Sequence, residues 1–402
     1  MAFRKLNSLD VAGKRVFVRV DFNVPLGAGG TIGDDTRIVA SLPTLRYLIE
    51  KGARLIVASH LGRPKGKRDP KQSMAPVRDR LERYLRQPVK FAESIVGPDA
   101  ERLALGLKDG ETLLLENLRF DAREEGNDPV FSAELAHLAQ AYVNDAFGAA
   151  HRAHASTAGI TAHLTECAAG FLMEREFEAL GRLLANADRP FVAILGGAKI
   201  SGKIDVLTNL MPRVDRIVIG GGMMFTFLRA KGLETGKSLV EEDRIPVARE
   251  VLQRPGAGGS LLLPTDCVVA EDVSGKDPGR TVAVESLPKE LMGVDIGAQT
   301  LRAIEDVIAT ARTVFWNGPM GVFEVPAYAA GTLGVARAMA AATARGAFTV
   351  VGGGDSLAAV HQAGIEDKFS HCSTGGGASL EFLEGRILPG IAALQSPVKA
   401  TP

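Results

Sequence analysis

Three basic side chains stand close together in the stretch AFGAAHRAHAS. His151, Arg152 and His154 are surrounded by glycine, alanine and serine, and no acidic residue lies between Asp145 and Glu166. A solvated basic turn would explain this cluster if it stood alone. If other stretches bring cations to the same place, their mutual repulsion instead favours a site that an anion occupies.

Other polar residues follow the predicted strands of the first half of the chain. They are Arg19, Asp21 and Asn23 in RVDFNVP, His60 and Arg63 in SHLGRP, Arg119 in LENLRF, and Arg37 in DDTRI, which opens the helix after the first strand. Each arginine alone is more typical of a surface ion pair. Ligands of parallel sheets bind beyond the carboxyl ends of the strands, so together these residues predict one cationic site. The planar fork of arginine matches phosphate and carboxylate, and we hypothesise a ligand that carries both groups.

A glycine-rich stretch in the second half, GGAKISGKID, follows the apolar run FVAIL. Gly197, Gly202 and Lys203 satisfy the spacing GxxxxGK of a P-loop. The next residue is Ile204, so the hydroxyl that a P-loop places on magnesium is missing, and we reject that interpretation. A glycine turn that enters a helix with two lysines, Lys199 and Lys203, still suits phosphate oxygens.

Three further glycine triplets follow predicted strands, in the stretches GGG (220–222), VGGGDS (351–356) and STGGGA (373–378). One triplet alone can be a tight turn. Several triplets at strand-to-helix junctions, with Asp355 inside one of them, are typical of phosphate cradles with a carboxylate that binds a metal. In the stretch WNGPMGVFE, Asn317 and Glu324 could contact magnesium or ribose, whereas Trp316 is interpreted as core packing.

These residues need a scaffold, and β-branched runs alternate with helical patterns along the chain. Strands are predicted at Arg15–Asn23, Arg54–His60, Thr112–Leu118 and Ala141–Phe147, and a second series at Phe191–Leu195, Arg216–Ile219, Ser260–Leu263, Thr313–Trp316 and Ala347–Val351. Helical spacing covers Ser41–Lys51, Pro76–Gln87 and Pro129–Gln140. Such alternation predicts βαβ units with buried parallel sheets. The predicted fold class is α/β, with two doubly wound, Rossmann-like domains joined by a helix at 171–187 and a hinge.

Composition limits the possible functions. The chain has 402 residues, and its 47 basic and 47 acidic residues leave no net charge, which argues against bulk electrostatic binding of nucleic acid. The three cysteines are too far apart in sequence for a CxxC metal site. Charges scattered through the N-terminal stretch predict no signal peptide, and no run of about 18 apolar residues predicts a membrane span. A cytoplasmic location is expected.

Taken together, the motifs resemble the phosphoglycerate kinase family. RVDFNVP, SHLGRP, LENLRF, FGAAHRAHAS, ILGGAK, WNGPMGVFE, GGGDS and STGGGA occur in the order and spacing of the family and cover nearly the whole chain. One departure is Gly202, where the family more often has an acidic residue. The resemblance implies reversible transfer of a phosphoryl group from 1,3-bisphosphoglycerate to ADP with Mg²⁺, which gives 3-phosphoglycerate and ATP in glycolysis.

The resemblance also implies roles for individual residues. The acid substrate would lie on Asp21, Asn23, Arg37, His60, Arg63, Arg119 and Arg152, with Arg19 and His154 completing the basic patch. The nucleotide would lie on Lys199, Lys203, Gly293, Asn317, Glu324, Gly352, Gly353, Gly354, Asp355 and Ser356. Asp355 is the expected magnesium ligand.

The same resemblance assigns functions to the domains. Residues 1–170 would bind the acid, 171–187 would connect, 188–385 would bind the nucleotide, and 386–402 would pack back on the first domain. A carboxylate is already the acceptor or the leaving group, so catalysis reduces to alignment and neutralisation of charge. The candidates are Arg37, Lys203, magnesium and the amides of Gly375 and Gly376. Substrates in different domains require closure, and a monomer is the family expectation.

Two other functions are considered. A dinucleotide-dependent dehydrogenase would need GxGxxG after an early strand, where this chain has RVDFN. A hinged anion-binding protein without catalysis would explain the arginines of the first half but not the glycine loops of the second.

Overall fold

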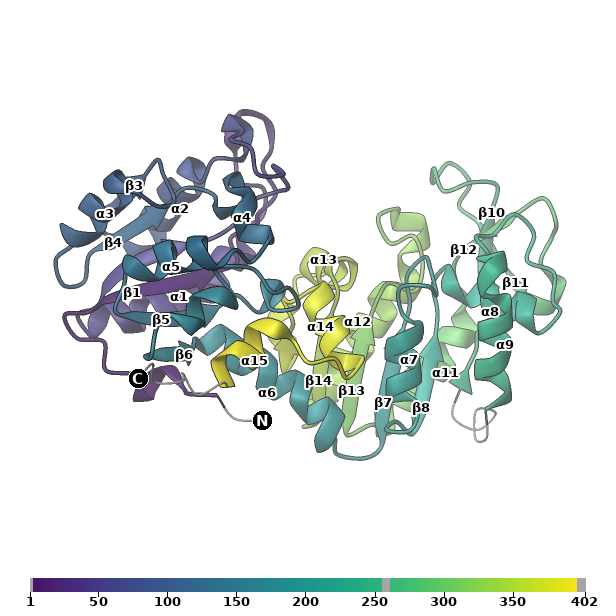
Figure 1. The fold of residues 1–402 in the computed structure, drawn as a ribbon. Coiled ribbons are helices and arrows are strands. Elements are labelled where there is room, and N and C mark those ends of the chain that lie inside the picture. The colour runs from purple at the N-terminus through teal and green to yellow at the C-terminus, as the bar shows by residue number, and fades with distance from the viewer. Residues whose placement is uncertain (1–2, 255–260, 396–402) are drawn as a thin grey trace. The chain divides into compact units, whose positions relative to one another are not determined.

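The structure is a computed structural model that describes residues 3–254 and 261–395. It contains two compact units, Met1–Glu178 with Ile387–Pro402 and Ala179–Arg386. Each unit is built on a parallel sheet, as Figure 1 shows. The predicted α/β fold class is confirmed.

The first unit holds a six-stranded sheet in the order β3-β4-β2-β1-β5-β6, and every pair is parallel. Its strands are β1 (Arg15–Val20), β2 (Arg54–Ala58), β3 (Val89–Ala92), β4 (Thr112–Leu115), β5 (Ala141–Asp145) and β6 (Cys167–Ala169). Its helices are α1 (Thr36–Glu50), α2 (Ala75–Leu85), α3 (Pro98–Leu105), α4 (Ala122–Glu125) and α5 (Pro129–His137). Phe17, Val18 and Val20 of β1 are fully buried, as expected where helices cover both faces of a sheet.

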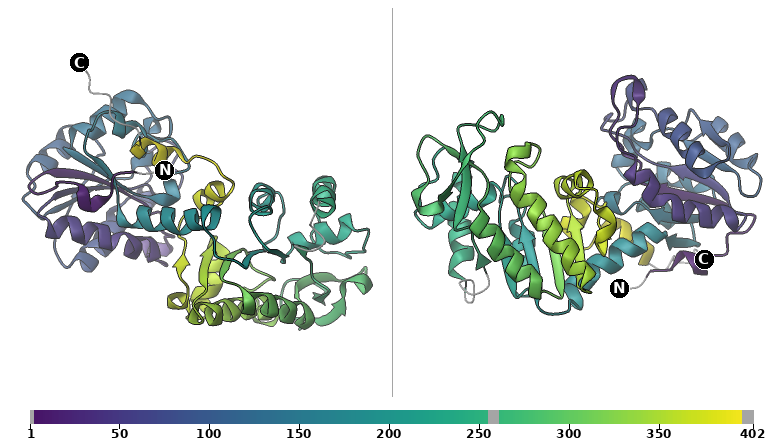
Figure 2. Two further views of the ribbon diagram at one scale, coloured as in Figure 1. Left: turned by 90° about the horizontal axis from the view of Figure 1, so that it is seen from below. Right: turned by 180° about the vertical axis from the view of Figure 1, so that it is seen from behind.

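The second unit holds another six-stranded parallel sheet, in the order β15-β14-β13-β7-β8-β9. Its strands are β7 (Phe191–Leu195), β8 (Arg216–Ile219), β9 (Leu261–Leu262), β13 (Thr313–Asn317), β14 (Phe348–Gly352) and β15 (His371–Cys372). Its helices are α7 (Ile204–Leu210), α8 (Met223–Ala230), α9 (Ile245–Gln253), α11 (Ala298–Thr310), α12 (Ala330–Ala344), α13 (Gly354–Gln362) and α14 (Gly377–Leu383). Figure 2 shows α11 and α12 on one face of this sheet and α7 and α8 on the other.

The chain passes from one unit to the other twice, between Glu178 and Ala179 and between Arg386 and Ile387. Helix α6 spans Phe171–Ala185, and the boundary between the units falls inside it, between Glu178 and Ala179. Helix α15 (Pro389–Gln395) belongs to the first unit, where the amide of Gly390 donates to the carbonyl of Ala150 at 2.9 Å. Residues 396–402 of the predicted C-terminal tail lie outside the described residues.

Several predicted strands were too long, and six strands were missed, among them β3, β6 and β15 of the parallel sheets. The strands expected to reach Asn23, His60, Leu118 and Phe147 end at Val20, Ala58, Leu115 and Asp145, because the polar residues that follow belong to the loops. The other three missed strands form an antiparallel sheet in the second unit: β10 (Asp266–Ala270), β11 (Arg280–Ala283) and β12 (Met292–Ile296). β11 is largely exposed, so it has no buried apolar run that would mark it as a strand. Among the described residues, no helix has the length and apolar character needed to span a membrane.

Candidate functional site

In the first unit, the loops that follow β1, β2, β4 and β5 meet at one edge of the sheet, which we call the basic edge. Strand register explains this, because Arg19 of β1 is opposite Ala58 of β2 and Asn144 of β5. All three strands therefore end at the same level. The loops that carry the predicted acid-binding residues start from there.

Hydrogen bonds join several of these loops to one another. The guanidinium of Arg37, in the first turn of α1, donates to the carboxylate of Asp21 at 2.9 Å. The side-chain oxygen of Asn23 accepts from the amide of Gly62 at 2.9 Å, and Arg119 donates to the carbonyl of Gly62 at 2.8 Å. Three segments distant in sequence are thereby fixed around Gly62.

The remaining arginines differ in exposure. Arg19 is fully buried, so its guanidinium is held by the protein and is not presented to a ligand. Arg63 and Arg152 are exposed, and Arg152 donates to the ring of His151 at 3.2 Å. Arg119 is 8% exposed and pairs with Glu125 at 3.2 Å, and burial lowers its pKa. The surface of the basic edge is therefore formed mainly by Arg37, Arg63 and Arg152, with Arg119 largely buried beside them and Arg19 fully buried.

Two histidines of the basic edge, His60 and His154, have lowered pKa values, which disfavours a positive charge on their rings. Burial, followed by the nearby charge of Arg19, lowers the pKa of His60 well below its ordinary value. The same two causes lower the pKa of His154 to about 3. Both rings can still bind an anion, but only as hydrogen-bond donors.

The basic stretch also has an acidic partner, which inspection of neighbouring residues alone could not find. Glu124 of α4 is fully buried and accepts from the amide of Ser156 at 3.0 Å and from its hydroxyl at 2.6 Å. Nδ1 of His154 lies 3.8 Å from the same carboxylate. Burial raises the pKa of Glu124 while Arg19 lowers it, so the charges of the two buried groups interact directly.

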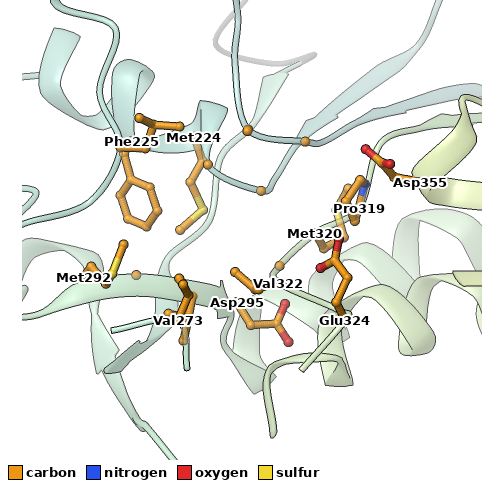
Figure 3. A pocket seen from close by; sticks show the side chains of 18 residues that line it. Met224, Phe225, Val273, Met292, Asp295, Pro319, Met320, Val322, Glu324 and Asp355 are labelled. Carbon is orange, nitrogen blue, oxygen red and sulfur yellow. The ribbon is translucent and has the colours of Figure 1, made fainter. Parts of the chain in front are cut away.

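In the second unit, a pocket of about 320 Å³ lies among the glycine loops (Figure 3). Of the predicted nucleotide residues, Gly293, Glu324 and Asp355 line it. Figure 3 shows Met224 and Phe225 opposite Val273 and Met292, with the carboxylates of Glu324 and Asp355 toward the other end. The pocket thus has an apolar part and an acidic part, which is typical of sites for small organic ligands.

Sequence reasoning missed most of the apolar lining. The missed residues include Met224, Phe225, Leu239, Met292, Met320 and Val322. A signal existed for four of them, because Met224 and Phe225 closely follow the glycine triplet 220–222, and Met320 and Val322 lie inside the stretch WNGPMGVFE. Leu239 had none, since only the tertiary fold brings its segment to the pocket, whereas Met292 directly precedes Gly293, which the family resemblance had assigned to the site.

Gly293 has a structural reason to be glycine. A Cβ built at this position would lie 1.9 Å from the ring of Phe225, so the ring packs directly on the backbone of β12. The amide of Gly293 donates to the hydroxyl of Ser238 at 2.9 Å. Two residues further along β12, Asp295 also lines the pocket, and burial raises its pKa to about 7.

Lys203 lies where β7 and β13 end. Its ammonium group donates to the carbonyl of Asn317 at 2.8 Å, and burial lowers its pKa to about 8. The side-chain nitrogen of Asn317 is buried and has no hydrogen-bond partner among the described residues. A buried donor of this kind is costly unless a ligand accepts from it, which supports a ligand at this point. Lys199 of the same loop is exposed.

The loop VGGGDS connects β14 to α13. β14 ends at Gly352, which is opposite Asn317, and α13 begins at Gly354 after Gly353, whose φ is +88°. The hydroxyl of Ser356 accepts from the amide of Gly318 at 2.6 Å, so it fixes the neighbouring loop. Asp355 lies in the first turn of α13 and lines the pocket.

A magnesium ion that arrives with a nucleotide fits this arrangement. The described residues contain no group of three or more His, Cys, Asp or Glu side chains that could form a metal cage. Mg²⁺ bound with phosphates commonly needs only one or two carboxylates, because phosphate oxygens and waters complete its coordination. Asp355 can provide one, and Glu324 lines the same pocket.

The predicted amides of Gly375 and Gly376 lie just before α14. The amide of Gly375 donates to the hydroxyl of Ser373 at 3.4 Å, and Gly376 has a φ of +54°. No other heavy atom lies within 4 Å of a Cβ built at Gly376 or Gly377, so this turn faces open space.

Comparisons with known proteins all point to one family. A family model described as phosphoglycerate kinase matches residues 6–386. The phosphoglycerate kinases of Chlorobium chlorochromatii and Chloroflexus aurantiacus are each 56% identical to the chain, over 98% of it and over 100% and 98% of their own lengths. The solved phosphoglycerate kinase from Coxiella burnetii has a TM-score of 0.89 and 39% identity, and covers 99% of this chain and 100% of its own. That from Pyrococcus horikoshii OT3 has a TM-score of 0.86 and 35% identity, with 98% of each chain covered.

The lowered pKa of His154 predicts a loss of stability in acid. Between its ordinary value near 6.5 and about 3, the unfolded chain binds a proton that the folded ring does not, so the folded state loses stability as the pH falls through this range. At pH 4.5 the contribution is roughly 2 to 3 kcal/mol. Melting followed by circular dichroism at pH 7 and pH 4.5 should therefore show a smaller acid-induced drop for His154→Gln than for the wild type. His163→Gln, an exposed control in the same unit, should keep the wild-type drop; equal drops in all three proteins would contradict the prediction.

The packing of Phe225 on Gly293 predicts that Gly293→Ala destabilises the second unit. The added methyl group has to displace the ring, at a cost of about 1 to 3 kcal/mol, and ADP affinity should fall as the pocket deforms. Urea unfolding followed by the fluorescence of Trp316, the chain's one tryptophan, reports on this unit. Gly181→Ala is the control, because a Cβ there meets no atom within 4 Å. A Gly293→Ala protein with unchanged stability and ADP affinity would be inconsistent with this packing.

Proposed function

The chain belongs to the phosphoglycerate kinase family, whose activity is a phosphoryl transfer of glycolysis, and we propose that the two units of the chain bind different substrates. The acid, 3-phosphoglycerate or 1,3-bisphosphoglycerate, binds at the basic edge of the first unit. ADP or ATP binds in the pocket of the second. The buried amide nitrogen of Asn317, which has no hydrogen-bond partner among the described residues, supports the second assignment most directly, because a ligand oxygen can accept from it.

The acid is held by groups with different tasks. Arg63, Arg119 and Arg152 supply positive charge for its phosphate and carboxylate groups. Neutral His60 and His154 supply hydrogen bonds without adding charge. Arg19 is fully buried, so it contacts His60 and Ser156 within the protein and does not contact the acid.

The nucleotide is held by shape and by a few polar groups. The apolar side chains around Phe225 and Met292 suit the flat face of a base, and Glu324 lies at the acidic part of the pocket, where it can accept from ribose hydroxyls. Lys203, Lys199 and the loop that begins at Gly352 contact the phosphates. Mg²⁺ bound with the nucleotide neutralises phosphate charge, and Asp355 is the carboxylate that would hold it.

The transfer needs no acid or base from the protein. An oxygen of the terminal phosphate of ADP attacks the phosphorus of the acyl phosphate, the bond between that phosphorus and the carboxyl oxygen breaks, and its electron pair remains on the carboxylate. No proton moves. The protein contributes alignment and positive charge around the transferring group, from Arg37, Lys203 and the turn at Gly375 and Gly376.

Division of the substrates between two units also requires a conformation in which both ligands are aligned. Helix α6, which continues from one unit into the other, is the element through which we propose hinge bending. Closure would also exclude water that hydrolyses an acyl phosphate. A monomeric state, a cytoplasmic location and the lack of nucleic-acid binding stay predictions.

The activity is tested by a coupled assay. The protein should form ATP when 1,3-bisphosphoglycerate, ADP and Mg²⁺ are all present, and each omission should abolish the signal. Reduction of a nicotinamide cofactor without added nucleotide would point to a dehydrogenase instead. Binding of the acid without turnover would point to a receptor.

Arg37→Ala tests the division of roles. The loss of a group that stabilises the transferring charge should lower turnover by roughly 10²- to 10³-fold, while ADP affinity stays nearly unchanged because Arg37 belongs to the first unit. The same steady-state assay with Arg46→Ala, a change on the same helix at an exposed residue, should give near-normal turnover. Near-normal turnover of Arg37→Ala itself would refute its role.

A further inference from the structure

Four buried side chains form a continuous chain of hydrogen bonds beneath the basic edge. The hydroxyl of Ser156 donates to Oε1 of Glu124 at 2.6 Å and accepts from Nε of Arg19 at 2.8 Å. Nη2 of Arg19 in turn lies 3.1 Å from Nδ1 of His60. Glu124, Ser156 and Arg19 are fully buried and His60 is 6% exposed. We call this chain of residues the relay.

The relay fixes where each proton lies. Arginine has only donors, so Nδ1 of His60 must accept from Arg19 and cannot carry a proton. Burial and the nearby charge of Arg19 lower the pKa of His60 well below its ordinary value, so the ring is neutral and its one proton is on Nε2. His60 therefore has a single donor in a defined position.

The relay also explains how a buried guanidinium is tolerated. A charge in a protein interior is costly unless it is paired and hydrogen-bonded. Arg19 donates to Ser156, to His60 and to the carbonyl of Val20, and Glu124 supplies the opposite charge through Ser156. Without Glu124 the arginine would lose its counter-charge and the constraint on its orientation.

We propose that Glu124 and Ser156 are positioning residues for the acid, which act through Arg19 to hold His60 as the neutral tautomer whose Nε2–H donates to a carboxylate or phosphate oxygen. The identity of the ligand rests on the proposed function. The relay itself rests on the contacts within the first unit. The His60 donor is held in one position by buried contacts, whereas Arg63 and Arg152 lie on exposed side chains.

The tautomer of His60 can be observed without any activity. Nitrogen-15 labelling of the histidines and long-range proton–nitrogen correlation distinguish the two neutral tautomers and the cation. In the wild-type protein at pH 7, His60 should be protonated at Nε2 alone, and His60→Gln identifies its signals. A wild-type spectrum with His60 protonated at Nδ1, or at both nitrogens, would overturn the proposal before any variant of the relay is made.

Ser156→Ala then breaks the relay at its centre while leaving both charged groups in place. His60 should become a mixture of tautomers, and the KM for 3-phosphoglycerate should rise about tenfold, as expected when one hydrogen bond is lost. The KM for ATP and kcat should change by less than about twofold, because the loss affects binding of the acid alone. Glu124→Gln, which removes the charge but keeps the shape, should change the tautomer and the KM in the same direction.

Ser41→Ala is the matched control. Ser41 is a fully buried serine of the same unit, and its hydroxyl has no hydrogen-bond partner among the described residues. It should leave the tautomer and both KM values unchanged. A folded Ser156→Ala protein with the wild-type tautomer and an unchanged KM for the acid would overturn the relay. Failure of 3-phosphoglycerate to bind even the wild-type protein would overturn the role of His60 toward the acid, whatever the spectra show.

Discussion

The repulsion among cations at one end of a sheet is the constraint on which the first unit depends. Arginines from the loops after neighbouring strands would destabilise the fold if nothing opposed them. The protein responds by keeping His60 and His154 neutral, by burying Glu124 beneath the cluster and by pairing Arg37 with Asp21 and Arg119 with Glu125. Positive charge is thereby concentrated in a few guanidinium groups at the surface.

The second unit is built on the same kind of sheet, but its pocket depends on a different interaction. Its pocket depends on close approach of backbone and apolar side chains, as at Gly293 and Phe225. Charge is sparse there: Lys203 donates to a backbone carbonyl, and Asp355 and Glu324 provide carboxylates. One unit is therefore suited to a small, highly charged acid, and the other to a larger ligand with an apolar part.

The sequence was sufficient for the fold class and for most elements that carry the site, because polar residues follow buried apolar runs at each strand end. It could not give the charge state of His60 or His154, which depends on burial. The sequence also did not reveal the acidic partner of the basic stretch. Glu124 is distant from Ser156 in sequence, and α4 places the two side chains in contact only in the folded chain. In the antiparallel sheet, β11 was missed because it is largely exposed, whereas the short buried run of β10 was overlooked. The apolar lining at Leu239 depends on the tertiary fold.

The central claim is that each unit binds one substrate, and hydrogen exchange with each ligand alone tests it most directly. 3-Phosphoglycerate should slow exchange in the loops after β1, β2, β4 and β5 and leave the glycine loops of the second unit unchanged. ADP with Mg²⁺ should slow exchange around 196–203, 317–324 and 352–356 and leave the basic edge unchanged. Protection of the second unit by 3-phosphoglycerate alone, with none at the basic edge, would contradict the account.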